Sequence, residues 1–504
     1  MKQDPPSSTR HRLGWPAPAW EEARRAIIGW PWGTVCPGLV VLVVALALRL
    51  ALVLRYPLLY DVDAYGRWLT RDHPFSTPWV PLFQVALYVL TRLADSVLAA
   101  RLLSACFGAA AVLSFWLLLR RPFGVPIAYL GALWLALNPL FVTFSVVPYQ
   151  EGLFFTLGFL ALWLALAPDK IHWFWLTLVL ALAGLTRYEG WLLSLFIWLL
   201  FLWRRRQAGA LTWRFAAGSA LALAWAPLLW IVVNRSVSPD MFQTLEPTLD
   251  PASLLATLGA EWSAWQLDLS LAGGVLALGG LLWLGWQARC GNELAWLLLA
   301  FLLGDLLVLA FLRPFPPGDL RLPLLSLPIV IAGVSGLLVD GAKLLWRAAR
   351  QWAQPRRQRV LMVGILGLAT ATLLIWYVPR ATERVATYDA VVLPSYLAAD
   401  DLGPQEQHAT LVVIGDDTMF YAFLFYAQED GWSGQAMQLT AVPATAVNLA
   451  ETLRMARARL LINYAPASAS GSITALAEQG ILVADTHGLG YAIWRVQAAP
   501  APGA

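Results

Sequence analysis

The sequence predicts a polytopic α-helical membrane protein of about 11 transmembrane helices, followed by a C-terminal extracytoplasmic α/β domain. Of the 504 residues, 59% are hydrophobic and only 13% are charged, and the mean hydropathy is +0.62. Soluble domains carry about 25% charged residues, so this chain has too few charges to cover a water-exposed surface. Apolar runs of about 18–22 residues, long enough to cross a bilayer as helices, recur between residues 37 and 378.

Eleven apolar stretches are the predicted spans. They lie near residues 37–54, 97–119, 125–147, 152–167, 173–186, 190–203, 215–233, 270–288, 294–312, 322–339 and 360–378. Many of the 27 tryptophans lie near the ends of these stretches, as expected for side chains anchored at the membrane interface. The fifth and sixth stretches are short for a bilayer of about 30 Å, and are compatible with a hairpin whose tip lies within the membrane.

The basic residues predict the orientation of the chain. Alternate connecting segments hold 19 lysines and arginines on one side and 8 on the other. Because the more basic segments stay in the cytoplasm, residues 1–36 are expected to be a cytoplasmic tail of a multi-pass plasma-membrane protein. Residues 19–30 within this tail fit either an amphipathic interfacial helix or a solvated segment. Residues 37–379 then form the transmembrane domain, and residues 380–504 lie outside after an odd number of spans.

The last 125 residues differ in character from the rest. "ATLVVIGDD" (409–417) and "RLLINYAP" (459–466) are typical of buried strands, and "DTMFYAFLFYAQE" (417–429) is typical of a helix. A small α/β domain is therefore expected. No glycine-rich phosphate loop follows either strand, so nucleotide binding is not expected. The dispersed net charge of +4 also gives no reason to expect a nucleic-acid partner.

Six charged residues on the predicted outer side are the candidate functional residues. They are Asp61, Asp63, Glu151, Arg187, Glu189 and Arg321. Ordinary loop charges, or a simple Arg187–Glu189 ion pair, would explain each of them singly. Their grouping favours a shared polar cavity, because a charge near the bilayer centre costs roughly 2.5–3.5 kcal/mol. The long outer loops, residues 55–96 and 234–269, would cover it. An unwound turn permitted by Gly190 would let both Arg187 and Glu189 point inward.

Several segments, taken in order, resemble the GT-C glycosyltransferases. They are "YDVDAYGRWLTR", "PWVPLFQVALYVLTRL", "ARLLSACFGAAAVLSFWLLLRRPFG", "LWLALNPLFVTFSVVPYQEGLFFTLGFLALWLAL", "LAGLTRYEGWLL" and "LRLPLLSLPIVIAGVSGLL". The resemblance is to the branch that contains dolichyl-phosphate-mannose–protein mannosyltransferases and the bacterial aminoarabinose transferase. It covers most of residues 37–378. Each motif alone is weak, and the ordered set is specific.

The resemblance implies a membrane enzyme that moves a sugar from a polyprenyl-phosphate carrier to an acceptor hydroxyl, with inversion, on the extracytoplasmic face. It implies that Asp63 or Asp61 is the base, that Glu151 occupies the second acidic position and that Arg321 occupies the late basic position. Bacterial members usually have adjacent Asp-Glu in the first loop. Here Val62 separates two aspartates, so the assignment of the base stays open between them.

The residue types suit this chemistry. A carboxylate accepts the acceptor proton, and the guanidiniums of Arg321 and Arg187 stabilise the leaving phosphate. Together with Glu151 and Glu189, the two arginines form the expected substrate-binding set. The four carboxylates also suit Mg²⁺ or Mn²⁺, but Asp-Val-Asp is too short a pattern to assign a metal. The partners expected are the lipid-linked sugar donor, membrane lipid and an acceptor that is a protein, a lipid or a glycan.

Two other classes of protein share some of these features. A secondary transporter or flippase also has many spans and intramembrane charges, but such proteins tend to place the charges at the bilayer midplane and often have internal repeats. No clear similarity between the two halves of the chain is present. A non-catalytic scaffold on the outer face would need none of the six charges. The enzyme is the favoured interpretation.

Overall fold

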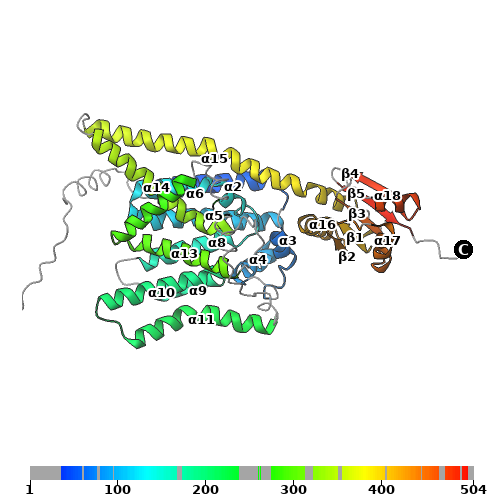
Figure 1. Ribbon diagram of the computed structural model, residues 1–504, viewed down its shortest axis with the longest axis horizontal. Helices are drawn as coiled ribbons and strands as arrows, with labels where there is room; N and C mark the ends of the chain where they lie inside the picture. The colour runs from blue at the N-terminus through cyan, green and yellow to red at the C-terminus, as the bar shows by residue number, and fades with distance from the viewer. Residues whose placement is uncertain are drawn as a thin grey trace, which may run out of the picture.

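The computed structural model describes residues 36–59, 62–75, 80–94, 96–166, 173–237, 259, 262, 274–312, 322–349, 355–402, 406–443, 445–464, 471–488 and 491–497. Within these ranges the chain forms a bundle of helices, and one long helix leads from the bundle to a mixed sheet near the C-terminus (Figure 1). Residues 1–35 of the predicted tail 1–36, as well as Asp61 and Arg321, lie outside the described residues, as does most of the predicted outer loop 234–269.

Helix occupies part of each of the eleven stretches predicted as spans. The helices are α2 (Cys36–Arg55), α5 (Val97–Phe123), α6 (Val125–Leu137), α8 (Glu151–Ala165), α9 (Trp173–Gly184), α10 (Glu189–Gln207), α11 (Trp213–Val237), a helix over 274–289, α13 (Glu293–Leu312), α14 (Leu322–Ala349) and α15 (Pro355–Asp400). Among the described residues, four segments are long and apolar enough to cross a membrane: Pro37–Arg55, Val97–Phe123, Trp213–Val233 and Leu324–Leu344. These apolar helices agree with a membrane protein, while the number of passes stays a prediction.

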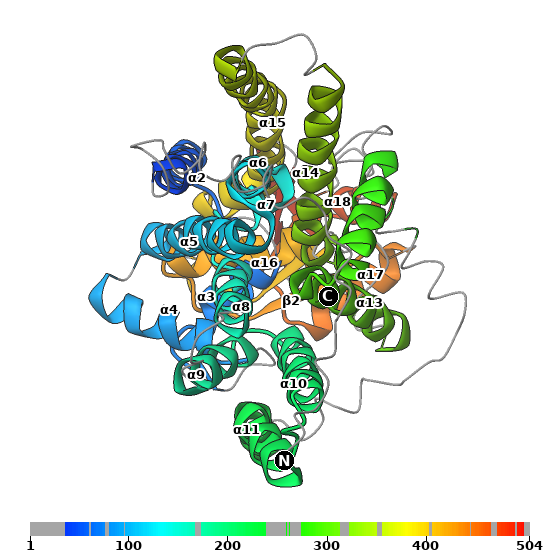
Figure 2. The ribbon, with the colours of Figure 1, turned by 90° about the vertical axis from the view of Figure 1, so that its left-hand side faces the viewer.

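Helix α5 lies at the centre of the bundle and contacts α2, α6 and α8 (Figure 2). Helix α8 continues the packing to α9, which contacts α10 and α11. Close packing between α5 and α8 depends on two glycines, because a Cβ atom at Gly152 would lie only 2.8 Å from the backbone nitrogen of Gly108. The start of α8, where Glu151 lies, is therefore pressed directly against the central helix.

The single span predicted at 125–147 is wrong in its second half. Helix α6 ends at Leu137, and a short helix α7 (Pro139–Thr143) follows. Asn138 caps α7, because its side-chain oxygen accepts a hydrogen bond from the backbone N–H of Phe141 at 3.1 Å. Pro139 disfavours the helical conformation of the residue before it, so the Asn-Pro pair interrupts the helix. After α7 the chain turns back toward Glu151.

The predicted outer loop 55–96 contains two helices, α3 (Val62–Leu69) and α4 (Leu82–Leu93). Helix α3 forms because Ala64, Tyr65 and Trp68 bury one side of it, with exposed fractions of 0%, 0% and 1%. Gln84 joins the two helices: its Nε2 donates to the carbonyl oxygen of Arg67 at 3.2 Å and to Thr70 Oγ1 at 3.1 Å. Asp63 therefore lies on a packed helix and not in a loop.

Helix α15 is 46 residues long and continues well past the predicted last span at 360–378. The predicted boundary between residues 379 and 380 falls inside it. Near the bundle α15 contacts α6 and α7, and toward its C-terminal end it contacts α16 (Asp417–Glu429) (Figure 1). One uninterrupted helix thus connects the bundle with the sheet.

The C-terminal part of the chain contains a five-stranded sheet in the order β2-β1-β3-β5-β4. The strands are β1 (Leu411–Ile414), β2 (Ala436–Leu439), β3 (Leu460–Asn463), β4 (Leu482–Gly488) and β5 (Tyr491–Val496). Strand β1 is parallel to β2 and β3, whereas β5 is antiparallel to β3 and β4. The two strands and the helix predicted in this region are confirmed at β1, β3 and α16.

The two faces of the sheet have different partners. Val412 and Leu461 belong to a buried cluster with α17 (Ala446–Met455) and α18 (Gly471–Glu478). The alternate residues Leu411 and Val413 belong to the large core that includes α15, α16 and the helical bundle. One face is therefore covered locally, and the other joins the sheet to the rest of the molecule.

Replacing Gly152 by alanine should destabilise the bundle. The added Cβ would meet the α5 backbone, and overpacking of this kind costs about 1–3 kcal/mol. Gly218→Ala in α11 is the matched control, because a Cβ there meets no atom within 4 Å and alanine favours helix over glycine by about 0.5–1 kcal/mol. Denaturation midpoints in detergent should fall for Gly152→Ala and not for Gly218→Ala. Equal midpoints would contradict the close α5–α8 contact.

Candidate active site

Three of the predicted site residues meet in one ion cluster. Glu151 begins α8, Glu189 begins α10, and Arg187 lies in the break between α9 and α10. Arg187 Nη1 contacts Glu151 Oε1, while its Nε and Nη2 contact the two carboxylate oxygens of Glu189 at 3.0 and 2.6 Å. The side chains are 9%, 2% and 18% exposed for Arg187, Glu151 and Glu189. One buried guanidinium therefore joins two helix starts.

The unwound turn predicted at residue 187 is confirmed. The backbone N–H groups of Thr186 and Arg187 both donate to the carbonyl oxygen of Ala183, at 3.1 and 3.0 Å, and the helix then restarts at Glu189. Gly190 has a different role from the one expected, because it lies within α10 and permits close approach: a Cβ there would be 2.6 Å from the Ala183 carbonyl carbon. The turn thus folds tightly enough for Arg187 and Glu189 to pair although they are only two residues apart.

Both acids lie in the first turn of a helix. The first turn of a helix carries unsatisfied N–H groups and partial positive charge, which stabilise carboxylates. One carboxylate oxygen of Glu151 is available as a hydrogen-bond acceptor. This atom, Oε2, is buried and makes no hydrogen bond to any residue that the structure describes. The neighbouring Gln150 Oε1 is in the same situation. Both atoms are acceptors, and they are suited to hydroxyl groups of a ligand.

Asp63 and Arg67 lie four residues apart on α3, so they share a face of that helix. Arg67 is 1% exposed. Burial lowers the pKa of Arg67, whereas the charges of Glu151 and Asp63 raise it. Arg67 therefore lies within electrostatic range of both acids. Sequence reasoning counted Arg67 only as an outer-loop cation, and its i,i+4 spacing from Asp63 was the signal that could have identified it.

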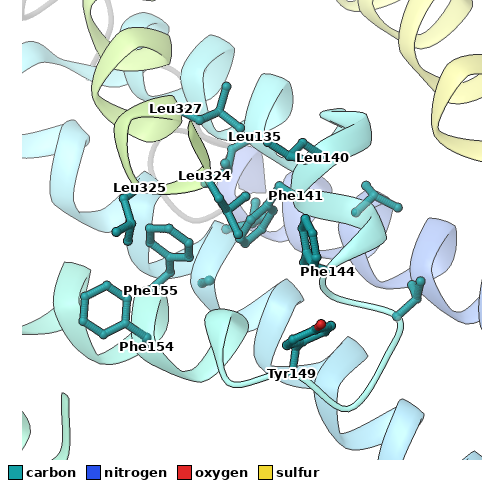
Figure 3. Close-up of a cluster of buried hydrophobic side chains, with 14 of the residues drawn as sticks. Leu135, Leu140, Phe141, Phe144, Tyr149, Phe154, Phe155, Leu324, Leu325 and Leu327 are labelled. Carbon is teal, nitrogen blue, oxygen red and sulfur yellow. The ribbon is translucent and has the colours of Figure 1, made fainter. Parts of the chain in front are cut away.

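Arg321 and Asp61 lie outside the described residues, but the start of α14 shows where the chain after Arg321 goes. Leu324 and Leu325 belong to the same buried cluster as Phe141 and Phe155 (Figure 3). Phe155 is in the second turn of α8, and its neighbour Phe154 has the Arg187 guanidinium 6.0 Å from its ring centre. The first turn of α14 is therefore packed near the helix start that carries Glu151.

The same cluster supports the segment that leads into α8. The rings of Phe144 and Tyr149 are 5.3 Å apart, and those of Phe141 and Phe155 are 5.6 Å apart, both edge to face. Figure 3 shows these rings beside leucines of α6, α7 and α14. Aromatic pairs of this kind add about 0.5–1.5 kcal/mol beyond their burial, and here they hold the approach to Glu151 in place.

Two buried arginines that the sequence analysis did not single out hold the irregular backbone around the site. Arg49 donates from Nη1 to the carbonyl oxygens of Ala45 and Ala136, at 2.9 and 3.1 Å. Arg101 donates from Nε to Val146 at 2.8 Å and from Nη1 to Tyr56 at 2.6 Å, in each case to the carbonyl oxygen. Each of these arginines is the single charge in an apolar stretch of the sequence. This pattern could have identified them, since an intramembrane cation normally has a specific partner.

The carboxylates expected to suit Mg²⁺ or Mn²⁺ are distributed between two groups. Glu151 and Glu189 share Arg187, Asp63 lies on α3, and Asp61 is outside the described residues. Among the residues that the structure describes, no group of three or more His, Cys, Asp or Glu side chains is arranged to hold a metal ion. A divalent metal remains a prediction from the residue types alone.

Known proteins with a similar sequence or fold show which family and which fold the chain resembles. Residues 72–231 match the family model described as dolichyl-phosphate-mannose-protein mannosyltransferase. This range contains α4 to α10, and with them Glu151, Arg187 and Glu189. The match covers 160 of the 504 residues, so it shows likeness to this family over that part of the chain. The resemblance read from the ordered motifs is confirmed.

The chain also shares its fold with solved structures. ArnT from Cupriavidus metallidurans is 15% identical, and its apo form and its form bound to undecaprenyl phosphate align with TM-scores of 0.53 and 0.56 over 93% of this chain and 98% of that one. A second solved structure is that of AglB from Archaeoglobus fulgidus, an archaeal oligosaccharyltransferase in complex with an inhibitory peptide and a dolichol-phosphate. It is 12% identical and aligns with a TM-score of 0.55 over 84% of this chain and 69% of that one. At these identities the likeness shows a common fold. No curated protein sequence gives a significant match.

Removing the guanidinium of Arg187 should destabilise the protein strongly. Arg187→Ala leaves the buried carboxylate of Glu151 without its counter-charge, and breaking a buried pair from one side costs about 3–5 kcal/mol. Arg92→Ala is the control, because its ion pair with Asp72 at 3.2 Å is 62% and 53% exposed, and exposed pairs are worth about 0–1 kcal/mol. Adding Glu151→Gln to Arg187→Ala should recover part of the loss in thermal denaturation. A loss no larger than that of Arg92→Ala would show that the cluster is not buried as described.

Proposed function

We propose that the protein transfers a sugar from a polyprenyl-phosphate carrier to an acceptor hydroxyl on the extracytoplasmic face of the membrane, with inversion at the anomeric carbon. The observation that carries this proposal is the buried Glu151–Arg187–Glu189 cluster of α8 and α10, with the buried Arg67 of α3 within the electrostatic influence of Glu151, Arg187 and Asp63. Glu151, Arg187 and Glu189 lie within the range that the family model matches, whereas Asp63 and Arg67 lie just before it. Such a set supports proton abstraction and phosphate binding at one place.

Asp63 is the proposed base. It is partly exposed at the start of α3, whereas Glu151 is buried and already bonded to Arg187. A base must reach the proton that it removes, at about 2.6–3.2 Å, which favours the accessible carboxylate. Arg67 lies one helical turn away from Asp63, and an ionised carboxylate is the form that accepts a proton. Asp61 remains the alternative base.

The lipid carrier is proposed from the compared structures and from the charges. The ArnT and AglB structures hold undecaprenyl phosphate and a dolichol-phosphate, and this chain has arginines suited to such a headgroup. Arg187 is engaged by two carboxylates, so we assign it to orienting Glu151 and Glu189 in substrate binding. That leaves Arg321, just before α14, as the principal phosphate ligand, because a guanidinium matches phosphate oxygens in a bidentate manner.

Glu151 is proposed to bind the sugar ring. Its Oε2, with Gln150 Oε1 beside it, offers buried acceptors that a sugar hydroxyl would satisfy. The remaining features of the proposal follow the sequence: about 11 passes, a cytoplasmic N-terminus and an extracytoplasmic α/β domain after α15. The donor would enter from the outer leaflet, so no soluble nucleotide is required. The acceptor is a hydroxyl of a protein, a lipid or a glycan.

Asp63→Asn should abolish sugar transfer without unfolding the protein. The amide keeps the shape of the carboxylate but does not accept a proton, and general-base catalysis is worth about 10²–10⁴-fold. The measurement is release of prenyl phosphate from short-chain prenyl-phosphate sugars, with candidate acceptors, by purified protein. Asp72→Asn, an exposed aspartate of the same outer segment, is the control and should keep full activity. Full activity in both Asp61→Asn and Asp63→Asn would remove the proposed base.

Arg321→Ala should weaken binding of the donor more than it slows the transfer of sugar from donor that is already bound. Loss of one charge-assisted contact to phosphate costs about 1.5–3 kcal/mol, which is a tenfold to hundredfold rise in the dissociation constant of a prenyl-phosphate sugar. Arg92→Ala, which removes an exposed outer arginine, should leave that constant unchanged. An unaltered donor affinity in Arg321→Ala would count against its role as phosphate ligand.

A further inference from the structure

Helix α3, which carries Asp63, is in direct contact with helix α16 from the C-terminal sheet region. The ring of Tyr65 lies 5.3 Å from that of Phe425 and 6.4 Å from that of Tyr426, the second pair edge to face. Tyr65 is fully buried, and Tyr426 is 8% exposed. The aromatic side of α3 is therefore covered by residues that lie about 360 positions further along the chain.

Hydrogen bonds from the C-terminal region also hold the segment that enters α3. The backbone N–H of Leu59 donates to Tyr426 Oη at 2.8 Å, and Tyr426 Oη donates to the Leu59 carbonyl oxygen at 3.2 Å. Tyr65 Oη donates to the same carbonyl. The N–H of Leu58 donates to Asp389 Oδ1 of α15 at 3.2 Å. These bonds satisfy backbone groups of a non-helical segment between α2 and α3, in which Leu59 is buried at 1% exposure.

The two sides of α3 thus have separate partners. Asp63 and Arg67 share one side, four residues apart, while Tyr65 is two residues from each and projects from the other. Arg67 is coupled to Glu151, whereas Tyr65 is packed on Phe425. An eight-residue helix held in this way moves as one body. A shift at its Tyr65 side must therefore displace Asp63.

We propose that Tyr426 is a positioning residue, through which α16 and the C-terminal sheet fix α3 and so set where Asp63 lies relative to Glu151 and Arg187. This proposal rests on the proposed function, since Asp63 is taken as the base. Tyr426 does not touch the reacting groups and acts through Leu59 and Tyr65. Its ring is itself fixed by Tyr396 of α15, 5.1 Å away and edge to face.

Misplacement of a reacting group by about 1 Å can reduce a rate about 10²-fold. Tyr426→Phe keeps the ring and its contact with Tyr65 but removes both hydrogen bonds to Leu59. The expected result is a fall in kcat of about tenfold, with a change in the KM for the lipid-linked donor of less than about threefold. Amide hydrogen exchange over residues 56–69 should become faster, because the local opening of α3 costs less free energy.

Tyr421→Phe is the matched control. It makes the same chemical change in the same helix, but Tyr421 is 37% exposed and has its ring contact with Phe420. Its kcat and its exchange over 56–69 should equal those of the unaltered protein. Exchange over β1 and β3 should be unchanged in both variants, which shows that the sheet stays folded. Tyr65→Phe, which removes the second bond to the Leu59 carbonyl, provides an independent variant and should speed exchange at 56–59.

The outcomes separate the two proposals. Wild-type kcat and wild-type exchange over 56–69 in Tyr426→Phe would overturn the positioning role. Equal losses of kcat in Tyr426→Phe and Tyr421→Phe would overturn it as well. If the unaltered protein transfers no sugar from any prenyl-phosphate donor, the proposed function fails, while faster exchange in Tyr426→Phe alone would still establish the coupling between α16 and α3. Faster exchange with unchanged kcat would mean that α3 is held by Tyr426 but that its position does not limit the reaction, which contradicts the inference.

Discussion

The pairing of Arg187 with Glu151 and Glu189 is the interaction on which the candidate site depends. A charge removed from water at the edge of a bilayer is costly unless a counter-charge lies against it. One guanidinium here serves two carboxylates that begin two different helices. The pairing therefore fixes the break between α9 and α10, the start of α8 and the distance between them. The residues proposed for substrate binding form part of the architecture of the bundle.

The same requirement explains the buried arginines elsewhere. Where helices break inside an apolar bundle, their carbonyl groups lose intrahelical partners. Arg49 and Arg101 supply donors to those carbonyls, at Ala136, Val146 and Tyr56. Irregular backbone near the site is thus compensated by cations of the surrounding helices. This makes it understandable that the segment from Asn138 to Gln150 is non-helical in places and yet fully packed, with Tyr149 at 0% exposure.

Much of the fold could be predicted from the sequence, because apolar length alone marks a membrane helix. Helix was found in all eleven predicted stretches, and the meeting of Glu151, Arg187 and Glu189 agrees with the grouping of outer charges. Helix α3 was not predicted, because a segment of eight residues is too short to contain a recognisable apolar run. The Asn-Pro pair at 138–139 was a signal for the break at Asn138. It lies within a long apolar run, however, and that run predicted one continuous span. The contact between Tyr426 and Leu59 spans 367 positions, and no local pattern encodes such a pairing.

Helix α15 has a mechanical consequence. Its 46 residues correspond to a rod about 70 Å long at 1.5 Å per residue. Because each residue of an α-helix also adds a rotation of about 100°, inserting or deleting one residue would swing the whole sheet around the rod axis and carry α16 away from α3. The number of residues in α15 therefore sets the rotational position of the sheet about the helix axis.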